Sequence, residues 1–222
     1  MGEVELTGTS MIIRSVLVFY GDAATAELSA KLAADVARLW NEPETEVIVN
    51  HQSYRLQFDI TGVYDPDLEP ETVWFNDDPA LNFFRIETYA SGNISFVDGI
   101  GSNTGYLKLQ NLEQTATTIA HEYGHTIGLE HPDIMDVRGR GIPGIMFPRG
   151  TLCDAAMQYD PLAKAGEYGG VMDPQHRRVL DSDIAGLKLH KLSFDDWGKA
   201  TLGEFTSVYH QKHENTEATE TS

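Results

Sequence analysis

The first half of the chain alternates between short apolar segments and one amphipathic stretch. Segment 11–20 (MIIRSVLVFY) is rich in β-branched and aromatic residues and predicts a strand. Over 25–40, apolar residues recur at every third or fourth position and charged residues occupy the opposite side, which predicts a helix lying on a sheet. Further strands are predicted at 46–50, 54–63, 83–89, 94–97 and 106–109. This order predicts an α+β fold, in which helices pack on a mixed sheet.

The pattern changes after His131. Glycine and proline are frequent over 138–150, so we expect little regular structure there. Helical apolar spacing returns at 179–192 and predicts a helix near the end of the fold. Residues 211–222 contain no core-forming side chain and predict a disordered tail.

The amino-acid composition argues against some classes of partner but does not identify a function. The 222 residues include 34 acidic and 16 basic side chains, which gives a net charge of −18. Nucleic acid and anionic membrane surfaces would be repelled, so neither is an expected partner. The most apolar early segment, 15–20, is too short to span a bilayer. A chain of this length can bury a sizeable core, and a monomer is the expected state.

The sequence becomes chemically specific at 121–131, which reads HEYGHTIGLEH. On a helix, His121 and His125 project from one face, one turn apart, which suits two nitrogen ligands of a single zinc ion. Glu122 follows the first histidine, where a carboxylate can act on water as a base without being a metal ligand. A chance occurrence on an ordinary helix is the alternative for the short HExxH pattern, but the full pattern fixes five positions.

Gly128 explains how a third ligand reaches the same ion. Glycine takes the left-handed conformation that ends a helix, so the chain can turn and return His131 to the metal. Pro132 then prevents the helix from resuming. Three histidines leave one zinc coordination position free for water, which is typical of a catalytic site.

These residues resemble the signature of the metzincin zinc endopeptidases, H-E-x-x-H-x-x-G-x-x-H. The resemblance implies that His121, His125 and His131 bind zinc and that Glu122 is the general base. It also implies an upper lobe with a twisted five-stranded sheet, a backing helix and an active-site helix, above a smaller irregular lower lobe. Protein or peptide is then the expected substrate.

The resemblance divides the chain into expected parts. The upper lobe would span 1–131, with the active-site helix at about 112–129. The lower lobe would span 132–200 and carry a methionine turn and a C-terminal helix, and the tail would follow at 211–222.

Two methionines are candidates for the methionine turn that metzincins place beneath the zinc. Met146, in GIMFP, resembles the matrixin pattern and is the preferred candidate; Met172, in GVMDP, leads more directly into the predicted C-terminal helix. Filling the core is the alternative role for either side chain. Both have proline two residues later, and in this the sequence resembles the matrixins within the family.

Acidic loops are weaker candidates for a second ion. Residues 65–71, 77–78 and 98–103 offer oxygen ligands of the kind that Ca²⁺ prefers, and many matrixins bind calcium, but solvated loop carboxylates are the default interpretation. Asp133 and Asp136 follow the motif and could line the cleft, which would favour basic peptides.

The leading hypothesis is therefore a zinc-dependent endopeptidase whose substrate adds to an exposed edge strand, most simply 94–97. A non-catalytic, zinc-stabilised binding module and a zinc hydrolase acting on a non-peptide substrate are the alternatives. The family resemblance favours an extracellular location. The polar start, MGEVELTGTS, lacks a signal-peptide pattern and keeps a cytoplasmic location as the other expectation.

Overall fold

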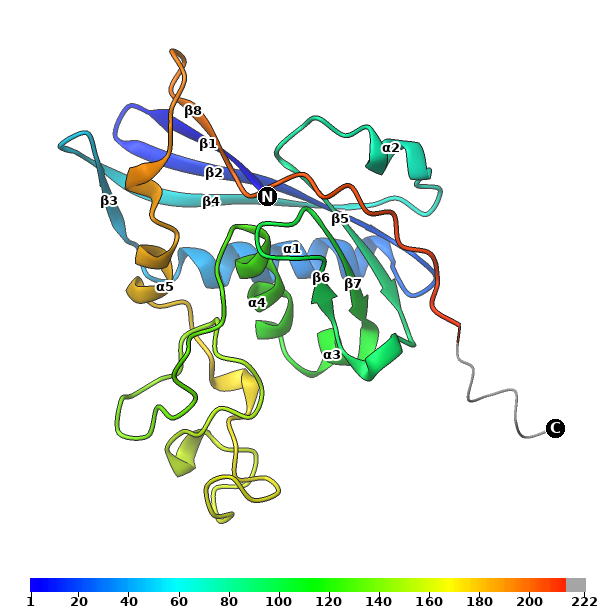
Figure 1. Ribbon diagram of the computed structural model, residues 1–222, viewed down its shortest axis with the longest axis vertical. Coiled ribbons are helices and arrows are strands. Elements are labelled where there is room, and N and C mark those ends of the chain that lie inside the picture. Colours follow the sequence, from blue (N-terminus) through cyan, green and yellow to red (C-terminus); the bar gives the residue numbers. More distant parts are fainter. Residues whose placement is uncertain (215–222) are drawn as a thin grey trace.

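A curled mixed sheet organises the computed structural model, which describes residues 1–214 (Figure 1). Within these residues the sheet has eight strands, in the order β3-β4-β2-β5-β7-β6, with β1 pairing to β2 and β8 pairing to β1. The strands are β1 (Gly2–Thr7), β2 (Ser10–Tyr20), β3 (Glu46–Val49), β4 (Gln52–Tyr64), β5 (Leu81–Glu87), β6 (Phe96–Val97), β7 (Thr104–Lys108) and β8 (Lys199–Leu202).

Parallel and antiparallel pairs are combined in this sheet. Strand β2 runs parallel to both β4 and β5, and β5 runs parallel to β7. Strand β6 pairs antiparallel with β7 and forms one edge of the sheet. This confirms the predicted combination of helices with a mixed sheet, although the number of strands is eight where five were expected.

The C-terminal part of strand β2, Leu17 to Tyr20, is buried on both faces, and the alternation of its side chains separates two cores. Leu17 and Phe19 point into the main core, while Val18 and Tyr20 pack in a smaller cluster on the opposite face. Helix α1 covers the main core (Figure 1). A strand with apolar side chains on both faces reads as a continuous apolar run, which is why 11–20 was recognisable in the sequence.

The helices are short apart from α1. They are α1 (Ala26–Asn41), α2 (Pro70–Trp74), α3 (Leu109–Gln114), α4 (Thr117–Thr126) and α5 (Asp181–Gly186), with 3₁₀ turns at Ser91–Asn93, Ala155–Met157, Pro174–His176 and Leu189–Lys191. Thr25 caps α1, since its hydroxyl accepts a hydrogen bond from the Leu28 amide at 3.1 Å. The helix predicted over 179–192 is limited to α5 and the last of these turns.

The active-site helix expected at about 112–129 is two helices, α3 and α4. Thr115 between them is extended, with φ −161°, and its hydroxyl accepts a hydrogen bond from the Thr117 amide at 3.2 Å. Threonine side chains compete in this way with helical backbone hydrogen bonds, which explains the break. Helix α4 then ends at Thr126, earlier than expected.

Two strands lie in segments whose sequence did not predict them. Strand β1 pairs antiparallel with β2, and β8 returns from the irregular part of the chain to pair antiparallel with β1. Both strands are partly exposed and carry polar residues, so their apolar signal is weak. The segment assigned to the lower lobe, 132–200, therefore ends with two residues that belong to the sheet. Before α5 this segment is irregular apart from short 3₁₀ turns, and most of it lies below α4 (Figure 1).

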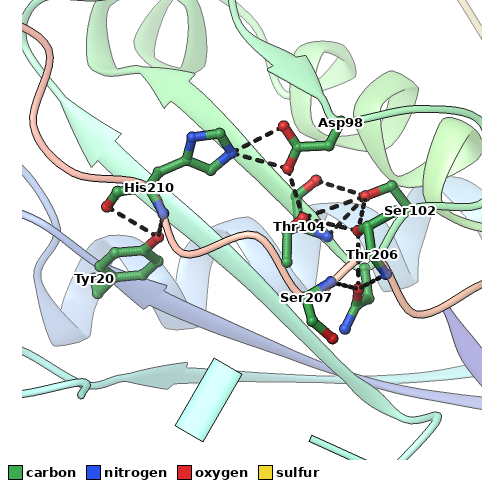
Figure 2. A network of polar contacts seen from close by, with 8 residues as sticks. Tyr20, Asp98, Ser102, Thr104, Thr206, Ser207 and His210 are labelled. Atoms are coloured by element: carbon green, nitrogen blue, oxygen red, sulfur yellow. Dashed lines mark hydrogen bonds and ion pairs between the residues drawn. The ribbon is translucent and has the colours of Figure 1, made fainter. Parts of the chain in front are cut away.

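The chain after β8 crosses the sheet and is held by a polar network (Figure 2). His210 contacts both carboxylate oxygens of Asp98, at 2.9 and 3.0 Å, and the hydroxyl of Tyr20 accepts a hydrogen bond from the His210 amide at 3.0 Å. The ring of His213 stacks on Tyr106 at 3.9 Å between centroids. The disordered tail predicted for 211–222 therefore differs from the structure over its first residues, and 215–222 lie outside the described residues.

One finding bears on the predicted absence of a membrane span. No helix within 1–214 combines the length and the apolar composition that crossing a bilayer requires.

Candidate metal centre

Helix α4 is fixed against the sheet by its own buried side chains. The hydroxyl of Tyr123 lies 2.9 Å from Ser15 Oγ on β2, and the indole Nε1 of Trp40 donates to the carbonyl of Ala120 at 3.1 Å. The Trp40 and Tyr123 rings meet edge to face, with centroids 5.7 Å apart. Because the helix is held on both sides of the motif, the direction in which His121 projects is set by the core.

Gly124 lets a methionine approach the helix from the other side. A Cβ atom built on Gly124 would lie 2.3 Å from Met146 Sδ, closer than van der Waals contact permits. Met146 is buried in the main core, directly against the turn of helix that carries the two histidines. Met172 packs instead with Val137 and Cys153 in a separate cluster, where it fills the core.

The helix ends in a turn that redirects the chain. Gly128 has φ +98°, in the left-handed region, and its amide donates to the His125 carbonyl at 3.1 Å. The Leu129 amide donates to the Gly124 carbonyl at 2.9 Å. These two bonds form a Schellman motif, which returns the chain toward the face that carries the histidines.

His121, His125 and His131 converge at this point. The Nε2 atom of His131 lies 3.0 Å from Nε2 of His121 and 3.1 Å from Nε2 of His125. Nitrogens bound to one zinc ion at ~2.0–2.1 Å with tetrahedral angles would be ~3.3 Å apart, so the spacing is close to that of a metal site. Within residues 1–214, this is the one group of three or more histidine, cysteine or acidic side chains whose ligand atoms gather in this way.

The opposite ring nitrogens are held by backbone carbonyls. Nδ1 of His121 lies 2.8 Å from the Ile145 carbonyl oxygen, and Nδ1 of His125 lies 2.7 Å from that of Leu129. A neutral imidazole that donates from Nδ1 presents the lone pair of Nε2, which is the arrangement that a metal ion needs. The residues present therefore fit a metal ion.

Burial favours the same neutral rings. Desolvation lowers the pKa of His121 well below its ordinary value, and it lowers the pKa of His125 to about 4. The pKa of His131 is also lowered, first by desolvation and then by the charge of Arg177. All three rings are available as ligands near neutral pH, because protonation does not compete with a metal there.

Glu122 faces a cavity beside the histidines. Only 7 % of this residue is exposed, and burial raises its pKa to about 8, against the opposing effects of Arg177 and Arg149. The cavity has a volume of about 250 Å³ and is also lined by His121 and His131. The carboxylate therefore lies at a surface shared with the candidate metal ligands, where it can reach a bound molecule.

Two arginines line this cavity, and sequence reasoning missed both. Arg149 follows the segment of Met146 and is exposed, while Arg177 is only 3 % exposed. No local pattern indicates that Arg177 would reach the site, because it comes from a distant irregular segment. The acidic residues expected at the rim lie elsewhere: Asp136 pairs with Arg138 at 2.5 Å, and Asp133 lines a different hollow. The expected preference for basic peptides thus has no support in this cavity.

Asp183 is a further residue that the sequence did not indicate. Its Oδ2 atom accepts hydrogen bonds from the amides of Ile145, at 3.2 Å, and Leu180, at 2.9 Å. The Ile145 carbonyl in turn contacts His121, so Asp183 connects α5 to a candidate ligand through the backbone of one residue, Ile145. The signal in the sequence is an acidic residue in the first turn of a helix, which is common and not specific.

The acidic loops proposed for calcium do not gather into a cluster of three within the described residues. Asp98, in the turn at 98–103, is engaged by His210 and accepts a hydrogen bond from Thr104 Oγ1 at 2.5 Å. Cys153 is buried, and burial raises the pKa of its thiol, as expected for a core residue.

Comparison of the chain with protein-family models finds no match, and comparison with curated proteins finds none either. The residues and the geometry of the site are therefore what indicate the class of protein.

Proposed function

We propose that this protein is a zinc-dependent endopeptidase of the metzincin type. The observation that carries the proposal is the convergence of three Nε2 atoms next to a buried glutamate at the wall of one cavity. His121, His125 and His131 would hold the ion, and the donor set of three imidazoles is one that zinc prefers. When bound there, zinc supplies Lewis acidity, which makes water a competent nucleophile near neutral pH.

Glu122 is the residue that moves protons in this proposal. One of its carboxylate oxygens accepts a proton from the attacking water, and the same oxygen then delivers it to the nitrogen of the departing amine. Residues 1–214 make no hydrogen bond to this carboxylate, so it is available to a molecule in the cavity. Its position directly after His121 keeps it close to the candidate metal ligands without converging with them.

The sheet edge offers a way to align an extended substrate. Strand β6 lies at the edge, and Ile94 and Ser95, just before it, line the cavity that contains Glu122. A peptide adding to this edge would pass beside the histidines, because the edge and the metal centre share that wall. The proposed methionine turn is at Met146, whose side chain lies against α4.

The test is a cleavage assay on an unstructured protein with the zinc-loaded chain, a chelated sample and the variant Glu122→Gln. We expect chelation to abolish cleavage and Glu122→Gln to lower kcat by about 10²–10⁴-fold while one zinc per chain is retained. Glu113→Gln, an exposed carboxylate on neighbouring α3, is the matched control and should leave cleavage unchanged.

The outcomes separate the alternatives carried by the sequence. Full activity of Glu122→Gln would refute its role as the base. One bound zinc per chain without cleavage would support a binding module, and chelator-sensitive hydrolysis of esters without cleavage of peptides would support a hydrolase with a non-peptide substrate.

A further inference from the structure

The cavity beside Glu122 has a positive wall that hydrolysis of a peptide bond does not itself require. Arg149 and Arg177 both line it, and the only acidic side chain among its lining residues in the described chain is Glu122. The protein side chains of this cavity therefore carry more positive than negative charge, in a molecule whose net charge is −18.

Arg177 is buried without an acidic hydrogen-bond partner. Its Nη1 donates to the Phe147 carbonyl at 3.1 Å, and its Nη2 donates to the carbonyl and hydroxyl of Thr117 at 3.4 and 3.3 Å. All of these acceptors are neutral, and within residues 1–214 its Nε has no partner. Burial lowers the pKa of Arg177 to about 10, so the guanidinium still carries its charge near neutral pH. A buried charge of this kind is costly unless an anion lies near it, and Glu122 is the one acidic side chain among the residues that line this cavity in the described chain.

Arg149 stands at the exposed part of the same wall. Its Nη2 makes one long hydrogen bond, 3.4 Å, to Asn111 Oδ1. Thr118 also lines the cavity, and its buried Oγ1 has no hydrogen-bond partner within the described residues. An accessible guanidinium offers a planar set of N–H donors that matches the two oxygens of a carboxylate, and a second guanidinium behind it adds positive charge.

We propose that this cavity binds a carboxylate of the peptide substrate, so that cleavage takes place next to a negatively charged group. The proposal rests on the endopeptidase function above and names its substrate class. Arg149 would donate hydrogen bonds to the carboxylate, and Arg177 would stabilise it through its buried charge. The carboxylate has two sources, an aspartate or glutamate side chain beside the scissile bond or the free C-terminus of a short peptide.

Paired peptides test the proposal. Cleavage sites are first mapped on an unstructured protein by mass spectrometry, and one cleaved sequence is then made with Glu, Gln or Lys at each position flanking the scissile bond. We expect kcat/KM for the best Glu peptide to exceed that of its Gln partner by at least about tenfold, with the Lys peptide poorest. Amidated and free C-termini distinguish the two sources. Equal rates for all charge states would overturn the proposal.

Variants assign the preference to the arginines. Arg149→Gln and Arg177→Met should reduce the Glu/Gln ratio toward one, mainly through KM, while Arg177→Lys should retain part of it. Arg140→Gln removes an exposed charge that lines a different hollow and should leave the ratio unchanged. If an arginine only supported the fold, its replacement would lower kcat/KM for the Glu and Gln peptides by the same factor, and the Glu/Gln ratio would not change. If Arg177→Met fails to fold, the exposed Arg149 still decides the question.

A binding measurement separates this proposal from the proposed function. The zinc-loaded Glu122→Gln variant is titrated with fluorescent Glu and Gln peptides, and anisotropy reports their Kd. Tighter binding of the Glu peptide, lost in the additional variant Arg149→Gln, would support the carboxylate site even if the wild-type chain cleaved nothing. Equal Kd values for the two peptides would overturn the carboxylate site even if cleavage were observed.

Discussion

Gly124 is the residue of the candidate metal-binding motif at which core packing most directly limits the size of the side chain. It lies between the two histidines of α4, and the space where its side chain would be is taken by Met146 Sδ and, at 3.2 Å, by Trp40. The helix can therefore rest on the methionine while its other face presents imidazoles to the cavity. In a bare HExxH pattern this position is variable, so the requirement for glycine comes from the tertiary packing of this chain.

The variant Gly124→Ala should be destabilised by about 1–3 kcal/mol, because the added methyl overpacks a buried contact. The gain in helix propensity from glycine to alanine, about 1 kcal/mol, offsets part of this loss. Urea unfolding of the metal-free chain measures the change. The double variant with Met146→Ala is the control: its cost should be smaller than the sum of the single costs by about 1 kcal/mol, since the clash is removed. Strict additivity would contradict the proposed contact.

At the scale of elements, one carboxylate connects α5 to the segment that carries Met146. Asp183 is only 9 % exposed and accepts hydrogen bonds from two amides, one at the start of α5 and one at Ile145. Gly144 beside it has no room for a side chain, since a Cβ there would lie 2.9 Å from Asp183 Oδ2. The backbone of Ile145, which contacts the ring of His121, is thus positioned by a residue of α5, at the other end of the irregular segment.

Near pH 4, Asp183→Asn should lower the free energy of unfolding of the metal-free chain by about 2 kcal/mol, because an amide NH₂ group has to be accommodated at a buried carboxyl group that accepts two hydrogen bonds. It should also weaken zinc binding by about tenfold, measured by competition with a chelator, because the carbonyl that orients His121 is less firmly held. Asp181→Asn, an exposed aspartate two residues away, is the matched control. Unchanged zinc affinity in Asp183→Asn would argue against the connection to His121.

The difference in stability between the wild type and Asp183→Asn should depend on pH, in a direction set by the pKa of Asp183. Burial raises the pKa of Asp183 above its ordinary value of 3.8, so the folded chain holds this proton more tightly than the unfolded chain. The stability contributed by this group is therefore fully present below pH 3.8 and is lost as the pH rises through the raised pKa. The free energy of unfolding of the wild type should exceed that of Asp183→Asn. This difference, measured without metal, should shrink as the pH rises from about 4 toward 7. An advantage that grows over this range would contradict the assignment.

Elements with strong local signals were predictable, and those that depend on distant partners were not. Strand β2 and helix α1 follow from an apolar run and an amphipathic repeat, and the turn after α4 follows from Gly128 and Pro132. The candidate metal ligands were found because four- and six-residue spacings encode their convergence. Strand β8 and Arg177 could not be found in this way, since each acquires its place only when the irregular segment has folded back onto the sheet.

At the scale of the whole molecule, net charge and local charge have opposite signs. The chain carries −18 overall, yet the cavity beside the candidate metal ligands has two arginines against one glutamate. Screening limits long-range repulsion to about 8–10 Å at ordinary ionic strength, whereas contacts inside the cavity are screened much less. The overall charge therefore does not oppose the binding of an acidic peptide in this cavity, and the proposed preference for a carboxylate is a short-range effect.

The described segment after β8 contacts the edge of the sheet that is proposed to align substrate. His210 reaches Asp98, which directly follows β6, and Asp98 also holds Thr104 at the start of β7 (Figure 2). The ring of His210 meets Phe96 edge to face, with centroids 5.7 Å apart. One histidine therefore restrains both strands of the edge hairpin from a position outside it.

His210→Ala should lower the free energy of unfolding by about 1–3 kcal/mol, from the lost contact with Asp98 and the lost aromatic packing. The loss should be local as well as global, because β6 is short and has a partner strand on one side only. Hydrogen exchange of the amides of β6 and β7 should accelerate more than that of β2, while the exposed control His190→Ala changes neither. Since a substrate strand would pair with β6, KM for peptides should rise in His210→Ala while zinc affinity stays the same. Uniform acceleration across the sheet would instead show that the segment stabilises the fold without restraining its edge.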